Sequence, residues 1–204
     1  MLNFFVKGGP VMYPLLVCSI ISLAIIFERT LFWLRLSRNR DEERVGRILE
    51  LAEKEEYESA WELGRQSKDY IVRVLMGGIA HRRYSLPSAL AMGAEEEIKR
   101  MSKYLNILDT IITVAPLLGI FGTVLGIINS FDLLGRAGIE HPQVVTGGIA
   151  QALITTATGL GVAMMTLLPY NYFQSKIQSA SKELEKFGTS LEITFQRQNA
   201  IFQA

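Results

Sequence analysis

The stretch GIAQALITTATGL at residues 148–160 lies inside a thirty-residue run, 144–173, that contains no Asp, Glu, Lys or Arg. A helix needs roughly 20 residues at about 1.5 Å each to cross a bilayer, so this run is long enough to span a membrane. It also carries one glutamine and five threonines. The run therefore predicts a membrane helix with an uncharged polar stripe, whose purpose has to be explained.

Two further apolar runs predict two more membrane helices. Residues 12–27 begin an anchor that continues through Glu28 and Arg29, and residues 111–128 are wholly uncharged. Basic residues follow the first run rather than precede it, which favours a retained anchor over a cleavable signal peptide. We therefore expect an all-α integral membrane protein with three transmembrane helices.

Charge is segregated along the chain and predicts its orientation. Residues 28–103 hold fifteen of the 21 Lys and Arg residues, and the residues after 173 hold four. Because positively charged loops stay in the cytoplasm, the N-terminus is predicted to lie outside and the C-terminus in the cytoplasm. The formal net charge of +1 gives no reason to expect a nucleic-acid partner.

These patterns divide the chain into four parts. We expect an N-terminal segment with the first span (1–36), a cytoplasmic helical domain (37–103), a pair of spans (104–175) and a cytoplasmic C-terminal helix (176–204). A short external turn at about 135–143 separates the paired spans. The long helices are expected to project into the cytoplasm.

The cytoplasmic segments have helical patterns. Residues 41–66 place apolar side chains near one face, and Glu43 and Arg47 pair at helical spacing. Pro87 predicts the start of a further helix that runs into the second span without a break. After residue 173 the chain is expected to continue as an amphipathic helix. The apolar face of 41–66 comprises Val45, Ile48, Leu49, Leu51, Ala52, Ala60, Trp61 and Leu63.

Small residues recur at intervals of three and four along the second and third spans. In lipid, where no hydrophobic drive brings helices together, small residues allow the close backbone approach that holds helices in contact. We expect these positions to form a tight helix contact. They are Gly119, Gly122, Gly126, Gly148, Gly159 and Ala163.

The polar stripe of the third span has two possible roles. Each threonine can bond to a carbonyl of its own helix or join two helices, whereas a concentration of hydroxyls can hold water in a narrow path. Gln151, Thr155 and Thr158 recur at helical spacing, with Thr156 beside them. Thr123 stands near the middle of the second span. None of these groups titrates near neutral pH, so such a path could hold water that carries a proton but would not bind the proton tightly.

The second span has carboxylates only near its two ends, at Asp109 and Asp132. Asp109 precedes Thr123 by fourteen residues, or about 21 Å along an ideal helix. Since an intramembrane carboxylate is the usual sign of a proton relay, a proton path here would need its titrating acid from another polypeptide. Asp109 is a candidate acid at the cytoplasmic mouth.

No catalytic, cofactor or metal site is expected. The chain has one cysteine, Cys18, and two histidines, His81 and His141, which are far apart and lack ligand spacing. An integral-membrane enzyme would need a nucleophile, a metal cluster or paired carboxylates in one pocket, and the sequence shows none.

The stretches APLLGIFGTVLGIINSF (115–131), GIAQALITTATGL (148–160) and LLPYNYF (167–173) resemble the core of the MotA/TolQ/ExbB proton-channel family, and within it the ExbB/TolQ branch. The resemblance implies a homopentamer in the bacterial inner membrane, with the second and third spans around the single-span helices of an ExbD- or TolR-like dimer. The partner's membrane aspartate would carry the proton. Proton passage would drive mechanical work on envelope transport machinery.

By position, Thr123 and Thr156 match the family's two pore threonines. Gln151 departs from the pattern, because many members have Glu there and a glutamine cannot change charge in this pH range. That role would be lost, moved to Asp109 or left to the partner, and sodium stays open as the coupling ion. The alternative function is a structural membrane scaffold that packs helices and recruits a cytoplasmic partner.

Overall fold

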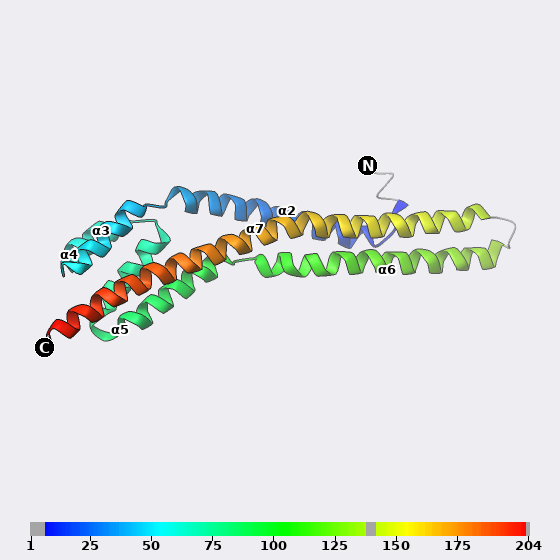
Figure 1. Ribbon diagram of the computed structural model, residues 1–204. Coiled ribbons are helices and arrows are strands. Elements are labelled where there is room, and N and C mark those ends of the chain that lie inside the picture. The colour runs from blue at the N-terminus through cyan, green and yellow to red at the C-terminus, as the bar shows by residue number, and fades with distance from the viewer. Residues whose placement is uncertain (1–6, 138–141, 203–204) are drawn as a thin grey trace. The chain divides into compact units, whose positions relative to one another are not determined.

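The computed structural model describes residues 7–137 and 142–202. Three helices, α2, α6 and α7, are long and apolar enough to cross a membrane, which confirms the predicted all-α fold with three spans. The external turn predicted at about 135–143 falls partly outside the described residues. The helices, drawn in Figure 1, are α2 (Met12–Arg38), α3 (Glu42–Glu53), α4 (Tyr57–Gly64), α5 (Tyr70–Met101), α6 (Leu105–Ala137) and α7 (Pro142–Phe202).

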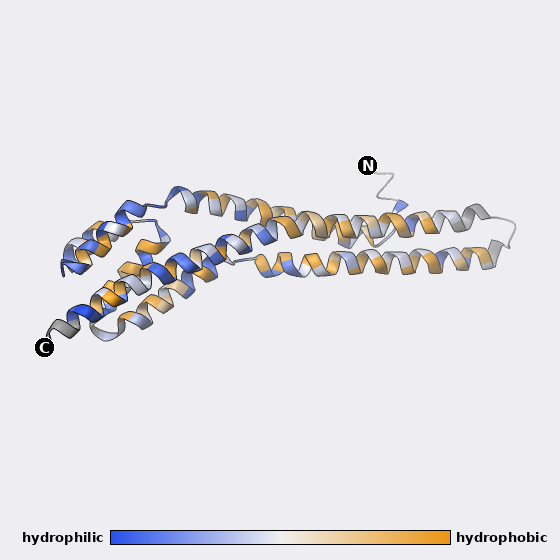
Figure 2. Cartoon of the chain, in the orientation of Figure 1, coloured by the Kyte–Doolittle hydropathy of each residue, from blue (hydrophilic) through white to orange (hydrophobic). Residues whose placement is uncertain are grey.

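The chain divides into two compact units. The membrane unit comprises residues 1–29 and 104–172, and the polar unit comprises residues 30–103 and 173–204. Hydrophobic residues cover α6 almost throughout, whereas hydrophobic and hydrophilic residues alternate around α3 and α5 (Figure 2). This is the difference expected between helices that face lipid and helices that bury one apolar stripe in water.

The membrane unit has a small apolar core, and most of its large side chains point outward. Val11, just before α2, and Met12 and Leu15 at its start pack against α6 and against Ala163 of α7. Outward-facing residues such as Phe121 are more than half exposed. Such exposure is normal in lipid, where the solvent is as apolar as the side chains.

The polar unit contains α3 and α4, two helices within the stretch 41–66 for which the sequence predicted a helical, amphipathic segment. Asp41 caps α3 by accepting a hydrogen bond from the backbone N–H of Arg44 at 3.0 Å. Glu55, with φ of 62°, separates the two helices. This turn resets the helical phase, so Trp61 is 43% exposed although the sequence placed it on the apolar face. The predicted apolar residues that are buried are Val45, Ile48, Ala52 and Ala60.

A sharp bend divides α5 just before Pro87, where the sequence predicted a helix start. Ser85 is non-helical, with φ of −159° and ψ of 95°, and its hydroxyl accepts from the N–H of Ser88 at 3.4 Å. The two halves of α5 fold back on each other, since Arg73 Nη2 donates to Glu97 Oε2 at 2.7 Å. The bend is therefore an N-cap and a helix start inside one long element.

The prediction of an unbroken helix from Pro87 into the second span is wrong. The helix that contains Pro87, α5, ends at Met101, and α6 begins only at Leu105. Tyr104 between them adopts φ of 68°, a left-handed conformation that costs a residue with a Cβ roughly 1–2 kcal/mol. The guanidinium of Arg29 lies 5.8 Å from the centre of the Tyr104 ring, a cation–π contact that holds the tyrosine at this break.

Candidate functional site

The contact between α6 and α7 brings the two backbones together. A Cβ built on Gly159 would lie 2.4 Å from the carbonyl oxygen of Ala115, and one on Gly126 would lie 2.9 Å from the carbonyl oxygen of Gly148. Carbon and oxygen atoms do not approach this closely without a shift of the backbone. These positions therefore require glycine for the helices to pack as they do.

The other small residues of the predicted contact lie in the same unit. A Cβ on Gly122 would overlap the side chain of Thr155, and one on Gly148 would overlap the hydroxyl of Ser130. Ala163 is 8% exposed and belongs to the apolar core shared with α2. All six predicted positions thus lie where chain segments of the membrane unit meet, and their part in oligomer packing stays a prediction.

The two predicted pore threonines lie at one level of the helix pair. Thr156 of α7 donates to the carbonyl oxygen of Gly119 on α6 at 3.1 Å. Thr123 is one turn after Gly119 and donates to the carbonyl of Ile120 in its own helix. Both side chains are half-buried. The structure therefore brings the threonines within about one helical turn, or about 5.4 Å, along the pair.

Gln151 and Thr155 lie against the turn that precedes α2. The buried hydroxyl of Thr155 donates to the carbonyl oxygens of Gly8 and Gln151, each at 2.8 Å. Gly9 has φ of +73°, and a Cβ there would lie 2.0 Å from Nε2 of Gln151. Sequence reasoning missed this docking, although the Gly-Gly-Pro stretch at 8–10 is the signal for a turn with positive φ.

The candidate acid Asp109 lies apart from the threonines. Its side chain is exposed near the start of α6, and its backbone carbonyl accepts from the hydroxyl of Thr113 at 3.2 Å. The helix between Asp109 and Thr123 is continuous, so the distance along it is about 21 Å. The structure therefore does not bring this carboxylate to the threonine level.

The charged pair at the end of the first uncharged run is self-compensating. Arg29 is 2% exposed, and its Nε and Nη2 atoms donate to the two carboxylate oxygens of Glu28. A buried guanidinium is costly unless it is paired, and Arg29 has both a carboxylate partner in Glu28 and a cation–π contact with Tyr104. The first segment of the membrane unit therefore ends in an ion pair whose two charges cancel.

A buried ion network orders the polar unit. Asp69, 1% exposed, caps α5 by accepting from the N–H of Ile71 at 2.8 Å. It also accepts from Arg40 Nη1 at 2.8 Å. Arg40 contacts Glu183 of α7 at 3.1 Å, and the hydroxyl of Tyr70 donates to Glu183 at 2.6 Å. The network joins the segment between α2 and α3 to the start of α5 and to α7.

The pKa values in this network follow from burial and from the carboxylates. Burial opposes the charged form of Arg40, but the adjacent Asp69 outweighs it, so the pKa of Arg40 is raised above its ordinary value. Burial and the hydrogen bond to Glu183 raise the pKa of the Tyr70 hydroxyl far above its usual range. Arg40 therefore stays cationic and Tyr70 stays neutral and donating at physiological pH.

Metal ligands are not clustered within residues 7–137 and 142–202: no group of three or more His, Cys, Asp or Glu side chains there could hold a metal ion. Between Asp109 and Asp132 in α6, and along residues 146–173 of α7, the polar groups are hydroxyls, side-chain amides and backbone carbonyls. Such groups bind water or pack helices, and they do not by themselves transfer a proton.

These features define a helical membrane protein built on a glycine-packed pair of spans that carries hydroxyls at one level. The model of the MotA/TolQ/ExbB proton channel family matches residues 66–186. The chain belongs to this family, as the motifs of the second and third spans predicted.

Relatives place the chain in the ExbB/TolQ branch. An ExbB-like biopolymer transport protein of Synechocystis sp. is 36% identical over 206 residues, covering 96% of this chain and 79% of the relative. A second ExbB-like protein of that organism is 32% identical over 200 residues, covering 93% of this chain and 92% of the relative. The Tol-Pal system protein TolQ of Haemophilus influenzae is 33% identical over 99 residues, covering 48% and 43%.

Proposed function

We propose that this chain is the channel subunit of a proton-driven motor of the ExbB–ExbD or TolQ–TolR type, in the bacterial inner membrane. Protons that pass through the complex, driven by the proton-motive force, power mechanical work on envelope transport machinery. Membership of a proton-channel family and three apolar helices support the membrane role. The names of the relatives, which refer to biopolymer transport, support the transport role.

The observation that carries this proposal is the common level of Thr123 and Thr156 on a closely packed helix pair. Each hydroxyl donates a hydrogen bond to a backbone carbonyl. The hydroxyl oxygen can therefore still accept a hydrogen bond from water or from a hydrated proton. The run 144–173 carries no Asp, Glu, Lys or Arg. An uncharged wall of this kind can order water in a narrow passage without binding the proton tightly.

The titrating acid comes from a second polypeptide in this proposal. A single-span ExbD- or TolR-like dimer supplies its membrane aspartate inside a homopentamer of this chain, with α6 and α7 facing the partner. Asp109 then acts at the cytoplasmic mouth, and Gln151 supports the passage by docking the turn at Gly8 and Gly9. Residues 37–103 and 176–204 lie in the cytoplasm, and the N-terminus lies outside.

The scaffold remains the second candidate function, and one observation favours it. Thr123, Thr155 and Thr156 all donate to carbonyl oxygens of the membrane unit, which is what threonines that only pack helices would do. A scaffold would keep its assembly and its partner but would not depend on the hydroxyl oxygens. The two functions therefore differ in what loss of a hydroxyl does to proton flux.

Proton flux in vesicles that contain the chain with its copurifying partner distinguishes them. We expect Thr123→Val and Thr156→Val each to lower coupled proton flux by up to about tenfold. Each change replaces a hydroxyl with a methyl group, so it removes one hydrogen-bonding oxygen while the side-chain volume stays nearly the same. Thr194→Val is the matched control, since Thr194 lies in α7 beyond the uncharged run and its hydroxyl likewise donates to a backbone carbonyl, that of Ser190. Undiminished flux in both pore variants would favour the scaffold.

A further inference from the structure

A surface cavity of the polar unit lies between α4 and α5. Its volume is about 420 Å³, and its wall includes Tyr57, Glu58, Trp61 and Glu62 of α4 together with Arg82 of α5. This volume falls within the roughly 300–1,000 Å³ that is usual for ligand sites in proteins. The whole cavity belongs to one compact unit of the chain, so its shape does not depend on the membrane unit.

The spacing of residues in α4 places two aromatic rings and two carboxylates on the cavity side of this helix. Tyr57 and Trp61 are four residues apart, and so are Glu58 and Glu62, so each pair lines up along the helix. Trp61 is 43% exposed, and both glutamates are exposed. Each ring therefore has a carboxylate on the residue that follows it.

The first of the two rings already holds a guanidinium. The guanidinium carbon of Arg82 lies 4.4 Å from the centre of the Tyr57 ring, and Nη1 of Arg82 donates to the carbonyl oxygen of Ile79 at 3.0 Å. A cation in this position is attracted by the negative face of the aromatic ring. The structure thus shows how α4 receives a guanidinium from a neighbouring segment.

The second ring offers the same chemistry to another molecule. Among residues 7–137 and 142–202, no cation lies over the Trp61 ring, and no basic group lies within 4.0 Å of the carboxylates of Glu58 or Glu62. Tryptophan gives the strongest cation–π contact of the aromatic residues. A guanidinium also matches the geometry of a carboxylate, with two parallel hydrogen bonds. An arginine side chain therefore fits this half of the cavity.

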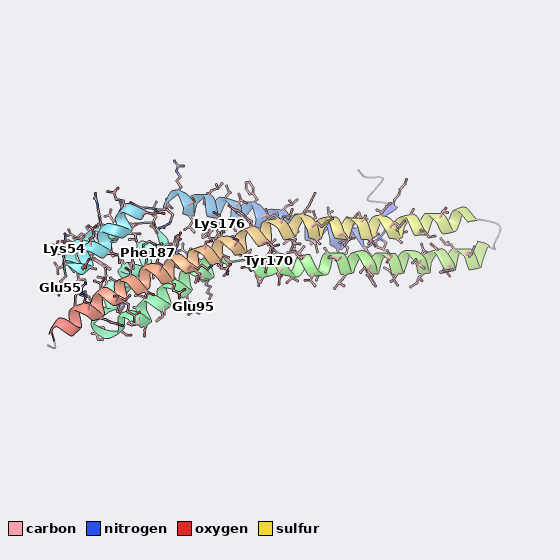
Figure 3. All side chains as sticks on the ribbon, viewed as in Figure 1. Lys54, Glu55, Glu95, Tyr170, Lys176 and Phe187 are labelled. Atoms are coloured by element: carbon pink, nitrogen blue, oxygen red, sulfur yellow. The ribbon has the colours of Figure 1, made fainter. Side chains whose placement is uncertain are left out.

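The charge around the cavity selects for a basic ligand. Residues 53–62 contain five glutamates and one lysine. Glu55 stands at the turn that leads into α4 (Figure 3), so its charge adds to those of Glu58 and Glu62. A field of this sign repels phosphates and other anions, and it speeds the association of a cationic partner.

The openness of the site favours a peptide over a small molecule. Small ligands are held by sites that bury roughly 70–90% of their surface, whereas Trp61 and its two neighbouring glutamates are themselves exposed to solvent. A peptide adds contacts along the surface on either side of its arginine. The described residues contain no group of three or more metal-ligating side chains, so the two carboxylates do not form a metal site.

We propose that this cavity docks a basic peptide segment of a partner protein, with one arginine stacked on Trp61 and paired with the carboxylates of Glu58 and Glu62. The site goes beyond the proposed motor function, since it requires only the polar unit, and it serves a motor subunit and a scaffold alike. Its failure would leave the proton pathway untouched, and the reverse also holds.

The test uses the full chain in detergent at low salt and a capped peptide of alternating glycine and arginine that carries a neutral fluorophore. Fluorescence anisotropy of the peptide measures binding. We expect saturable binding that Trp61→Leu weakens by about twofold to fivefold, because the cation–π contact is lost. The double change Glu58→Gln and Glu62→Gln should weaken binding by about tenfold, because the charge-assisted hydrogen bonds are lost.

Two control variants show whether these effects belong to the cavity. Glu95→Gln removes an exposed acid of α5 (Figure 3), and Tyr84→Leu removes an exposed aromatic ring of α5, both outside the cavity wall. Neither change should alter the affinity for the peptide. Equal affinities of the starting protein, Trp61→Leu and the double glutamine variant would overturn the proposal.

Further ligands separate the other possible occupants. The same peptide with citrulline in place of arginine keeps the shape without the charge, and it should bind at least about tenfold more weakly. Free acetyl-arginine amide should not saturate the protein in the range where the peptide does. Equal binding of the citrulline peptide, or saturation by the free amide in that range, would contradict peptide docking. A smaller oligomer mass in Trp61→Leu would also contradict it, since the occupant would then be a second copy of this chain.

Discussion

Different interactions stabilise the membrane unit and the polar unit internally. In the membrane unit, glycines let α6 and α7 meet backbone to backbone, and hydroxyls bond to carbonyls across the contact. In the polar unit, an apolar core is combined with a buried ion network around Asp69. The difference follows from the solvent, because lipid removes the hydrophobic drive that water supplies. Close packing replaces it in the first unit.

The chain carries natural probes that report on each unit separately. Both tryptophans, Trp33 and Trp61, lie in the polar unit, so tryptophan emission follows that unit. The single cysteine, Cys18, is half-buried beside the apolar core of the membrane unit, so its rate of labelling by a maleimide follows the opening of that unit. Each substitution below is expected to move one probe and leave the other unchanged.

The largest effect is expected from Asp69→Ala in the polar unit. The change removes the cap of α5 and a fully buried partner of Arg40, which lowers the free energy of unfolding of that unit by roughly 3–5 kcal/mol. The tryptophan transition should shift strongly in detergent-induced unfolding, with Cys18 labelling unchanged. Glu43→Gln is the control, since Glu43 pairs with Arg47 on the exposed surface and contributes little.

Gly159→Leu should weaken the membrane unit by roughly 1–3 kcal/mol. The Cβ of the new leucine would overlap the backbone carbonyl oxygen of Ala115. Only a separation of α6 from α7 could relieve this overlap, because the neighbouring atom belongs to the backbone. Cys18 labelling should accelerate while tryptophan emission stays constant. Gly161→Leu is the matched control, because a Cβ at Gly161 meets nothing within 4 Å. Equal labelling rates in the two variants would show that the helices are not in backbone contact.

A smaller loss, about 1–2 kcal/mol, is expected from Gly9→Ala. Alanine is disfavoured at φ of +73°, and its methyl group would displace the amide of Gln151. The turn should then detach from α7, which Cys18 labelling would detect as a faster reaction. A rate identical to that of the unsubstituted chain would mean that the turn does not dock on α7.

The smallest change should have the opposite sign. Gly46 lies exposed within α3, where an added methyl group meets nothing within 4 Å. Gly46→Ala should therefore stabilise the polar unit by about 0.5–1 kcal/mol through helix propensity alone. The tryptophan transition measures it. Destabilisation would indicate that this face of α3 is covered by another molecule.

The helices of the spans could be predicted because long uncharged runs have one solution in lipid. The break before α6 could not, since it depends on a left-handed Tyr104 rather than on a glycine or proline. The exposure of Trp61 was missed for a related reason, because Glu55 adopts positive φ and resets the helical phase. Local sequence gave no sign of either turn.

The candidate site could be predicted in part. Motif spacing brought Thr123 and Thr156 into consideration together, and the fold places them at one level. The docking of Gly8 and Gly9 on Gln151 and Thr155 joins segments more than 140 residues apart, which no local pattern encodes.

Proton conductance of the chain with and without its partner tests the central claim most directly. The chain alone, reconstituted in vesicles, should conduct protons no faster than empty vesicles, because the run 144–173 has no carboxylate to relay them. The complex with the single-span partner should conduct, and Asp→Asn in the partner's span should abolish the flux. Robust conduction by the chain alone would contradict the account.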